Sequence, residues 1–290
     1  MANPSCHLPG GWNVLYAGPA FSTLAGVLGG LLFLGIITLM IEGGNPDNNS
    51  GQRGVQARDQ RNGTGTPPDA RAIIRTRTLM LFLPAFLSLL VSSFFFANVT
   101  GEQICNRGYI VGILASSLLA IGALGIFNGI AWMLEVYGES NKDLRRAAVT
   151  FTYISYFIVI AFLADSGVTI ISNAFNNNPP GYALGLLIAY APLLLISVVI
   201  VREWFMPKES HRSGSQLAAV YVPAIYVVIT LVLYAVLTSY NPSEWGSLND
   251  WKTYLALSVA LFFPAVTVII YARALPDERP YQDLHSGPAA

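Results

Sequence analysis

Asp165 is the residue whose type and position could do chemistry, because it is the only ionisable side chain deep in a long apolar stretch. Thr169 follows it by four residues, and Ser172 and Asn173 continue the same helical stripe. A carboxylate at the centre of a bilayer costs about 2.5–3.5 kcal/mol on insertion scales, so such a residue typically serves ion or proton movement. The alternative is that Asp165 lies at the headgroup level, because the apolar run 147–164 already crosses most of a membrane.

A second pattern that could carry function is an aromatic-x-Pro tripeptide, which occurs in four of the apolar stretches. Proline removes one backbone hydrogen bond and frees a carbonyl about one turn earlier, so a helix can bend there. Four bends at similar depth predict a hinge layer around a cavity, although proline is also common in membrane helices without such a role. The candidate hinges are Pro84, Pro192, Pro223 and Pro264, and the candidate groups lining a cavity or ion path are Asp165, Thr169, Asn128, Tyr190 and Tyr221.

Seven long apolar segments must position these residues. Hydrophobic residues make up 53% of the 290-residue chain and charged residues only 11%. A hydrocarbon core of about 30 Å needs about 20 helical residues to cross it, and open strands cannot pair their backbone in lipid. We therefore predict an all-α membrane protein, a seven-transmembrane-helix bundle in the cell membrane. The predicted spans are 20–41, 79–97, 109–134, 147–171, 182–201, 217–237 and 254–272.

The distribution of Lys and Arg predicts the orientation of the bundle. If the spans alternate in direction, fourteen of the 16 basic residues fall on one side, and only Arg107 and Lys252 fall on the other. Cytoplasmic loops retain positive charge, so the N-terminus is predicted outside and the C-terminus in the cytosol. This topology gives an extracellular tail at 1–19, a flexible Arg-rich cytosolic loop at 42–78 and a cytosolic tail at 273–290.

Both cysteines, Cys6 and Cys105, fall on the predicted outer side, where an oxidising environment allows a disulfide between them. The alternative is two unpaired thiols. With only His7 nearby the cysteines make an incomplete zinc set, so we predict no metal site and no cofactor. Asn98-Val99-Thr100 is a glycosylation sequon on the same side, relevant only in a eukaryotic host.

Small and aromatic residues predict architecture. Gly26-x-x-x-Gly30 and Gly125-x-x-x-Gly129 allow helix backbones to approach closely. Tryptophans flank the predicted spans, where indole rings favour the headgroup level, so we predict that they anchor the protein in the membrane. The five tryptophans are Trp12, Trp132, Trp204, Trp245 and Trp251.

Several function classes are excluded by what the spans lack. A retinal pigment needs a lysine in the last span, and 254–272 has none. An intramembrane protease needs two deep aspartates or a Ser–His pair, but the predicted spans contain one aspartate, Asp165, and no histidine. A net charge of zero gives no basic surface for nucleic acid. We therefore predict a non-enzymatic protein whose partner is the lipid bilayer and which permeates or transports a small solute or ion. The alternatives are a seven-helix receptor or sensory protein, and a non-catalytic membrane subunit or scaffold.

Overall fold

A computed structural model describes residues 14–44, 68–102, 104–138, 142–175, 179–205, 212–241, 245 and 251–275. Within these ranges the chain forms seven helices and no strand, and each predicted span lies inside one of them. Each helix contains a segment of 22 to 30 residues that is apolar enough to cross a membrane. The predicted all-helical membrane fold is confirmed. The helices are α1 (Val14–Gly44), α3 (Pro68–Gly101), α4 (Cys105–Gly138), α5 (Lys142–Phe175), α6 (Pro179–Phe205), α7 (Arg212–Ser239) and α8 (Trp251–Ala274).

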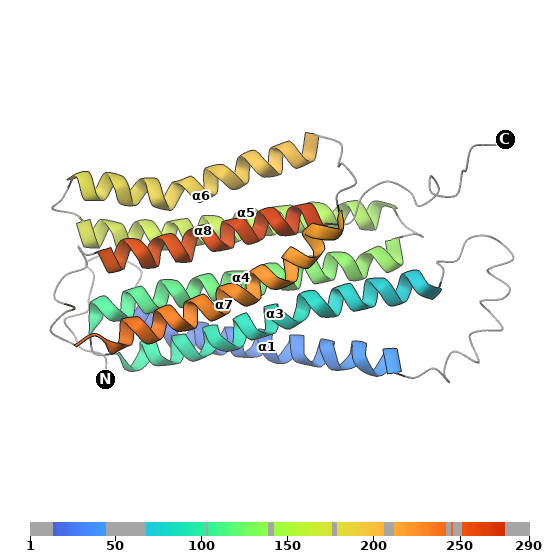
Figure 1. The fold of residues 1–290 in the computed structure, drawn as a ribbon, viewed down its shortest axis with the longest axis horizontal. Coiled ribbons are helices and arrows are strands. Elements are labelled where there is room, and N and C mark those ends of the chain that lie inside the picture. Colours follow the sequence, from blue (N-terminus) through green and yellow to red (C-terminus); the bar gives the residue numbers. More distant parts are fainter. Residues whose placement is uncertain are drawn as a thin grey trace, which may run out of the picture.

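The helices run side by side in an elongated bundle with two ends (Figure 1). We call one end the rim: α3 ends there at Gly101, α4 begins at Cys105 and α8 begins at Trp251. The opposite end is the basic end, where α3 carries Arg75 and Arg77 and the terminal turns of α6 and α8 carry further arginines. The two ends thus separate the basic residues as alternation predicts. Which end faces the cytosol stays a prediction.

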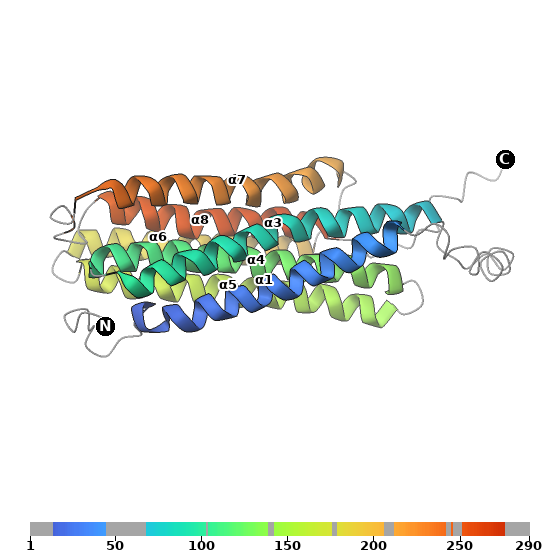
Figure 2. The same cartoon turned by 90° about the horizontal axis from the view of Figure 1, so that it is seen from below.

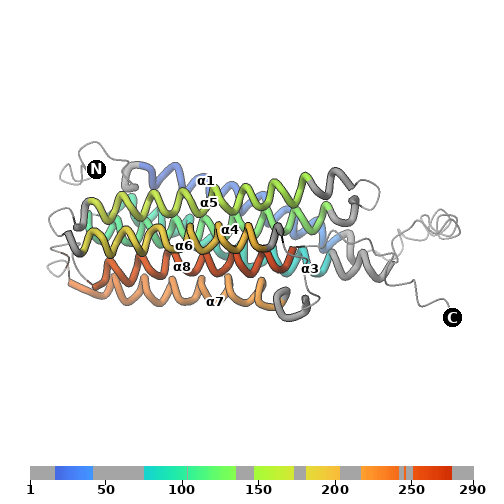
Figure 3. Tube along the Cα trace, turned by 90° about the horizontal axis from the view of Figure 1, so that it is seen from above, coloured from blue at the N-terminus to red at the C-terminus, as the bar shows by residue number. Residues whose placement is uncertain are grey.

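Helix α4 forms the centre of the bundle. It packs against α1, α3, α5, α7 and α8, and its apolar segment is the most buried of the seven. Helix α1 lies across α3 and α4 at one margin (Figure 2), whereas α6 packs against α5 and α8 at the other. Helices α5, α6, α8 and α7 follow one another along the remaining face (Figure 3). Interior chemistry must therefore come mainly from α4 and its neighbours.

Glycines on one face of α4 allow α3 to approach it closely. A Cβ built on Gly125 would lie 2.6 Å from the Cβ of Ala85, and one on Gly129 would lie 2.1 Å from the Phe82 ring. The predicted packing role of this glycine pair is confirmed. The equivalent prediction for Gly26 and Gly30 holds only in part, because Gly26 lies against Ser93 of α3 while Gly30 has no atom within 4 Å.

The helices extend beyond the predicted spans at several ends, which corrects the predicted tail and loop. Helix α3 begins at Pro68, so residues 68–78 of the predicted flexible loop 42–78 are helical. Proline is favoured in the first turn, where its missing N–H has no partner to lose, and helix-forming residues follow it. Helix α1 likewise begins at Val14, inside the predicted tail 1–19, and α8 ends at Ala274. Residues 45–67 and 276–290 lie outside the described residues.

Candidate functional site

The tyrosines predicted to line a cavity lie on the outside of the bundle. Tyr190 is 48% exposed and Tyr221 is 61% exposed, whereas Pro192 and Pro223 are buried. Successive residues of a helix are rotated by about 100°, so an aromatic residue two positions before a proline lies on nearly the opposite face. In α6 and α7 the motif therefore turns its proline inward and its aromatic ring outward, so Tyr190 and Tyr221 do not fit a lining role in the interior. In α3 both Phe82 and Pro84 are buried.

Asp165 also faces out of the bundle. Its side chain is exposed, and Thr169, four residues on, donates a hydrogen bond from Oγ1 to the Asp165 backbone carbonyl at 3.1 Å. The apolar segment of α5 ends at Ser172, about 10 Å further toward the rim. This outward direction does not fit an inward-facing ion site, whereas the depth of Asp165 in the membrane stays a prediction.

Asn128 is the predicted lining residue that the structure places in the interior. Its side chain is fully buried on α4, and its Oδ1 accepts a hydrogen bond from the Tyr156 hydroxyl of α5 at 3.3 Å. The Tyr271 hydroxyl of α8 would lie 3.4 Å from a Cβ on Gly125, which is three residues before Asn128 on α4. We call Asn128, Tyr156 and Tyr271 the Asn128 cluster. Within the described part of the chain, Asn128 Nδ2 and the Tyr271 hydroxyl have no hydrogen-bond partner.

A second buried polar group lies between α4 and α7 near mid-depth. The Tyr226 hydroxyl makes a short hydrogen bond with Ser117 Oγ. Since the Ser117 hydroxyl donates to the Leu114 carbonyl at 2.7 Å, Tyr226 is the donor in that bond. Thr230 Oγ1 donates to the Tyr226 carbonyl at 2.8 Å, and the Phe263 ring of α8 lies 5.1 Å from the Tyr226 ring. The Tyr226 side chain thus connects α4, α7 and α8.

These two polar groups lie on one stripe of the interior. Ser117 and Asn128 are eleven positions apart, or about three full turns, so both project from the same face of α4 about 16 Å apart. On α8, Thr267 and Tyr271 continue the face that begins with Phe263, at successive intervals of four residues. We call this stripe the polar interior: Ser117, Asn128, Tyr156, Tyr226, Thr230, Thr267 and Tyr271, all of them buried and uncharged.

The only charged side chain among the buried residues of the described ranges is Lys252, in the first turn of α8 at the rim. It is 6% exposed, and its Nζ lies 4.1 Å from the centre of the Tyr240 ring and 5.1 Å from that of Trp245. Asn106 of α4 donates from Nδ2 to the Trp245 carbonyl at 2.8 Å. The cation therefore joins the connection between α7 and α8 to the start of α4.

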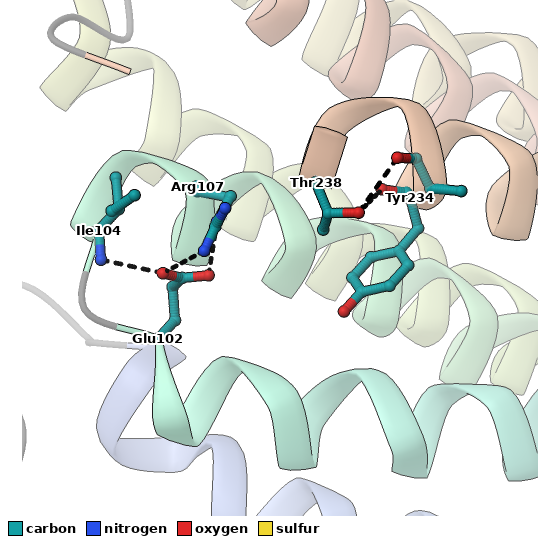
Figure 4. Close-up of polar contacts among 6 residues, drawn as sticks. Glu102, Ile104, Arg107, Tyr234 and Thr238 are labelled. Carbon is teal, nitrogen blue, oxygen red and sulfur yellow. Dashed lines mark hydrogen bonds and ion pairs between the residues drawn. The ribbon is translucent and has the colours of Figure 1, made fainter. Parts of the chain in front are cut away.

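The turn between α3 and α4 is held by Glu102, as Figure 4 shows. Its carboxylate accepts hydrogen bonds from the backbone N–H of Ile104 at 3.0 Å and from Arg107 Nε at 2.6 Å. A carboxylate at the beginning of a helix also interacts favourably with the helix dipole. In the same view, Thr238 near the end of α7 donates to the Tyr234 carbonyl at 2.9 Å. The turn between α3 and α4 at the rim is thus held by an ion pair and a hydrogen bond to the backbone.

Predictions for other single residues have different outcomes. Asn98 lies in the last turns of α3 and within its apolar segment, whereas a glycosylation acceptor belongs to a surface loop. Cys105 opens α4, but Cys6 lies outside the described residues, so their disulfide stays a prediction.

Among the tryptophans predicted as membrane anchors, Trp251 is exposed as an anchor should be. Trp132 and Trp245 are instead buried in the protein, which corrects their predicted anchoring role.

Sequence reasoning did not single out Tyr156, Tyr226 or Tyr271, although they are three of the seven residues of the polar interior. A tyrosine in an apolar segment is equally compatible with a lipid boundary and with a buried hydrogen bond, so its type alone does not distinguish them. The spacing of Ser117 and Asn128 on the face of α4 next to its glycines was a usable signal.

Comparison with known proteins adds no functional assignment, because no protein-family model, no curated protein and no solved structure matches the chain.

Proposed function

We propose that this protein permeates a small uncharged polar solute through the space between α4, α5, α7 and α8. The observation that carries the proposal is the polar interior, in which two fully buried hydrogen-bonding atoms have no partner within the described ranges. Lipid and apolar side chains cannot form hydrogen bonds with such atoms, so polar groups inside a membrane protein are costly and typically have a function. Hydroxyl and amide groups spaced along the interior could form hydrogen bonds in turn with a polar solute as it moves past them.

The chemistry of the polar interior favours an uncharged solute over an ion. Its side chains are hydroxyls and one amide, and the Asp165 carboxylate faces outward. Moving an ion into a medium of low dielectric constant is costly unless a charge or many dipoles offset that cost. The Lys252 cation lies at the rim, in a different part of the bundle from the Asn128 cluster. The ion branch of the sequence prediction therefore has less support than the solute branch.

The four prolines support movement in this bundle. Pro84, Pro192, Pro223 and Pro264 are all buried, so each breaks the hydrogen-bond ladder on the inward face of its helix. A bend at that face changes the distance between helices without exposing a backbone carbonyl to lipid. Such bends would allow the interior to open for a solute. A role as hinges accordingly stays part of the proposal.

The test is solute flux in liposomes that contain the pure protein. Stopped-flow light scattering would measure the permeabilities to water, urea and glycerol, and we expect at least one of them to exceed that of protein-free liposomes. Tyr226→Phe, which removes the hydroxyl bonded to Ser117, should lower that permeability several-fold. Tyr221→Phe makes the same chemical change on the exposed face of the same helix and should leave it unchanged. Equal permeability with and without protein for all three solutes would refute the proposal.

A further inference from the structure

We infer that the Asn128 cluster is a binding site for the acceptor oxygen of an uncharged guest. The guest is either one water molecule or the oxygen of a small amide-like or alcohol-like solute. The inference rests on the proposed function for the identity of a solute guest, but the existence of the site rests on the cluster itself. Its donors are the Asn128 amide and the Tyr271 hydroxyl, which project from α4 and α8.

Hydrogen-bond accounting indicates that something is bound there. An asparagine side chain has two N–H donors and one acceptor oxygen, and a phenol has one O–H donor. The Asn128 oxygen is used by Tyr156, whereas Asn128 Nδ2 and the Tyr271 hydroxyl find no acceptor within the described ranges. Both residues are fully buried, so bulk water cannot satisfy these donors. One oxygen acceptor between the two side chains would satisfy both donors, and we infer that it is present.

The backbone of α4 brings the two donors together. A Cβ on Gly125 would lie 3.4 Å from the Tyr271 hydroxyl, which therefore lies directly against α4. Gly125 is three residues before Asn128, so the hydroxyl and the amide lie on adjacent turns of one helix face. The space at Gly129, the next glycine, is taken by the Phe82 ring. Gly125 is itself packed closely against Ala85, so the site is placed by the two donors, the Asn128 amide and the Tyr271 hydroxyl.

The donor set defines the class of the guest. The Asn128 amide N–H and the Tyr271 O–H can both donate to one oxygen, so the pair suits an oxygen acceptor, whereas a cation would need several oxygen ligands. An anion would lack a positive partner, because the described side chains of the cluster are neutral. The apolar segment of α4 ends at Leu134, about 9 Å beyond Asn128, so the shorter route for the guest is from the basic end.

Tyr271→Phe tests the site through the sign of a change in melting temperature. If the hydroxyl has no guest, its removal relieves an unsatisfied buried group, and the Tm of the purified protein should rise or stay the same. If a guest is bound, the variant loses a hydrogen bond and its Tm should fall by about 2–4 °C. Tyr226→Phe, which loses a direct bond to Ser117, is the control showing that the assay detects one buried hydroxyl bond. A Tm that does not fall in Tyr271→Phe overturns the inference.

A double-mutant cycle tests whether one guest joins both donors. Asn128→Leu should lower the Tm, and Tyr271→Phe added to it should lower the Tm by less than it does alone, because the guest has already been lost. Additive shifts would overturn a shared guest. A cryo-EM map should show a non-protein peak within hydrogen-bond distance of Asn128 Nδ2 and the Tyr271 hydroxyl, and an empty map at a resolution that shows ordered water would overturn the site even if the variants fold poorly.

The flux experiment separates the two guests and separates failure of the site from failure of the proposed function. If Tyr271→Phe lowers both the Tm and the permeability to urea or glycerol, the guest is the solute. If it lowers the Tm while wild-type liposomes show no flux, the site holds a structural water and the proposed function fails. If flux is present and Tyr271→Phe raises the Tm, the proposed function stands and the site fails.

Discussion

The direction in which a side chain projects from its helix decides whether it lies in the interior, as the aromatic-x-Pro motifs of α6 and α7 show. Pro192 and Pro223 turn inward while Tyr190 and Tyr221, two positions earlier, face out of the bundle. Side-chain direction also distinguishes Asp165, which is exposed on α5, from Asn128, which is buried on α4, the most central helix. Residue type alone nominated the two tyrosines, Asp165 and Asn128 as lining groups and the prolines as hinges. Their direction on the helix decides which of them lie in the interior.

Lys252 yields a prediction at the residue scale. Lys252→Met keeps most of the apolar stem but removes the cation that lies over the rings of Tyr240 and Trp245. A desolvated cation–π contact contributes about 0.5–2 kcal/mol, so the variant should unfold at a Tm several degrees below that of the wild type. Arg202→Met, at an exposed position in the last turn of α6, is the matched control and should leave the Tm unchanged. Equal Tm values for the two variants would contradict a stabilising role for Lys252.

At the scale of helices, α3 and α4 are joined by close packing and by a hydrogen bond from Ser92 Oγ to the Ala115 carbonyl at 2.8 Å, whereas α1 and α3 are joined by a pair of serines. The glycines of α4 admit the side chains of α3. Helix α1 instead meets α3 through a reciprocal pair, in which Ser22 Oγ donates to the Ser93 carbonyl at 3.0 Å and Ser93 Oγ donates to the Ser22 carbonyl at 3.0 Å. Apolar surface provides little attraction between helices in lipid, so packing of small residues and polar pairs must supply it.

Gly125→Ala tests the shape of the contact between α3 and α4. The new methyl group would lie 2.6 Å from the Cβ of Ala85, which is fixed to its backbone and cannot rotate away. The helices must separate, and overpacking of this kind costs about 1–3 kcal/mol, so we expect a lower Tm in detergent. Gly30→Ala introduces the same methyl group where nothing lies within 4 Å, and it should be neutral or slightly stabilising. If the two variants unfold at the same temperature, the contact is less tight than described.

The serine pair is tested by a double-mutant cycle of Ser22→Ala and Ser93→Ala. Interhelical hydrogen bonds in membranes contribute about 0.6 kcal/mol on average, so each single variant should lower the free energy of unfolding slightly, with positive coupling between them. Thr23→Ala is the control, because Thr23 Oγ1 bonds within its own helix to the Pro19 carbonyl. A coupling of zero between the two serines, measured by unfolding in detergent, would mean that the pair does not hold α1 on the bundle.

For the whole molecule, the asymmetry between the two ends leads to a prediction of topology. The basic end should lie in the cytosol, so a tag on the C-terminus should resist protease added to intact cells, and a tag on the N-terminus should be digested. Reversing the asymmetry should weaken this preference: replacing Arg71, Arg75 and Arg77 by Gln would produce a mixed population. Digestion of the C-terminal tag in intact cells expressing the wild type would invert the predicted orientation. Permeabilised cells, in which both tags are accessible, are the control.

The sequence by itself determined that the helices are apolar enough for lipid to surround them, that there are seven of them, and that basic residues collect at one end of the bundle. These depend on the composition of segments of about 20 residues, and lipid imposes the same length and backbone requirements on each segment wherever it packs. Only the tertiary structure decided that α4 is central, that Asn128 meets Tyr156 and that Asp165 faces outward. Apolar residues predominate on every face of these helices and the few polar ones are widely spaced, so the pattern gives little indication of how each helix is rotated about its axis. That rotation is set by the fit of small residues and hydrogen-bonding groups between neighbouring helices, which lie far apart in the chain.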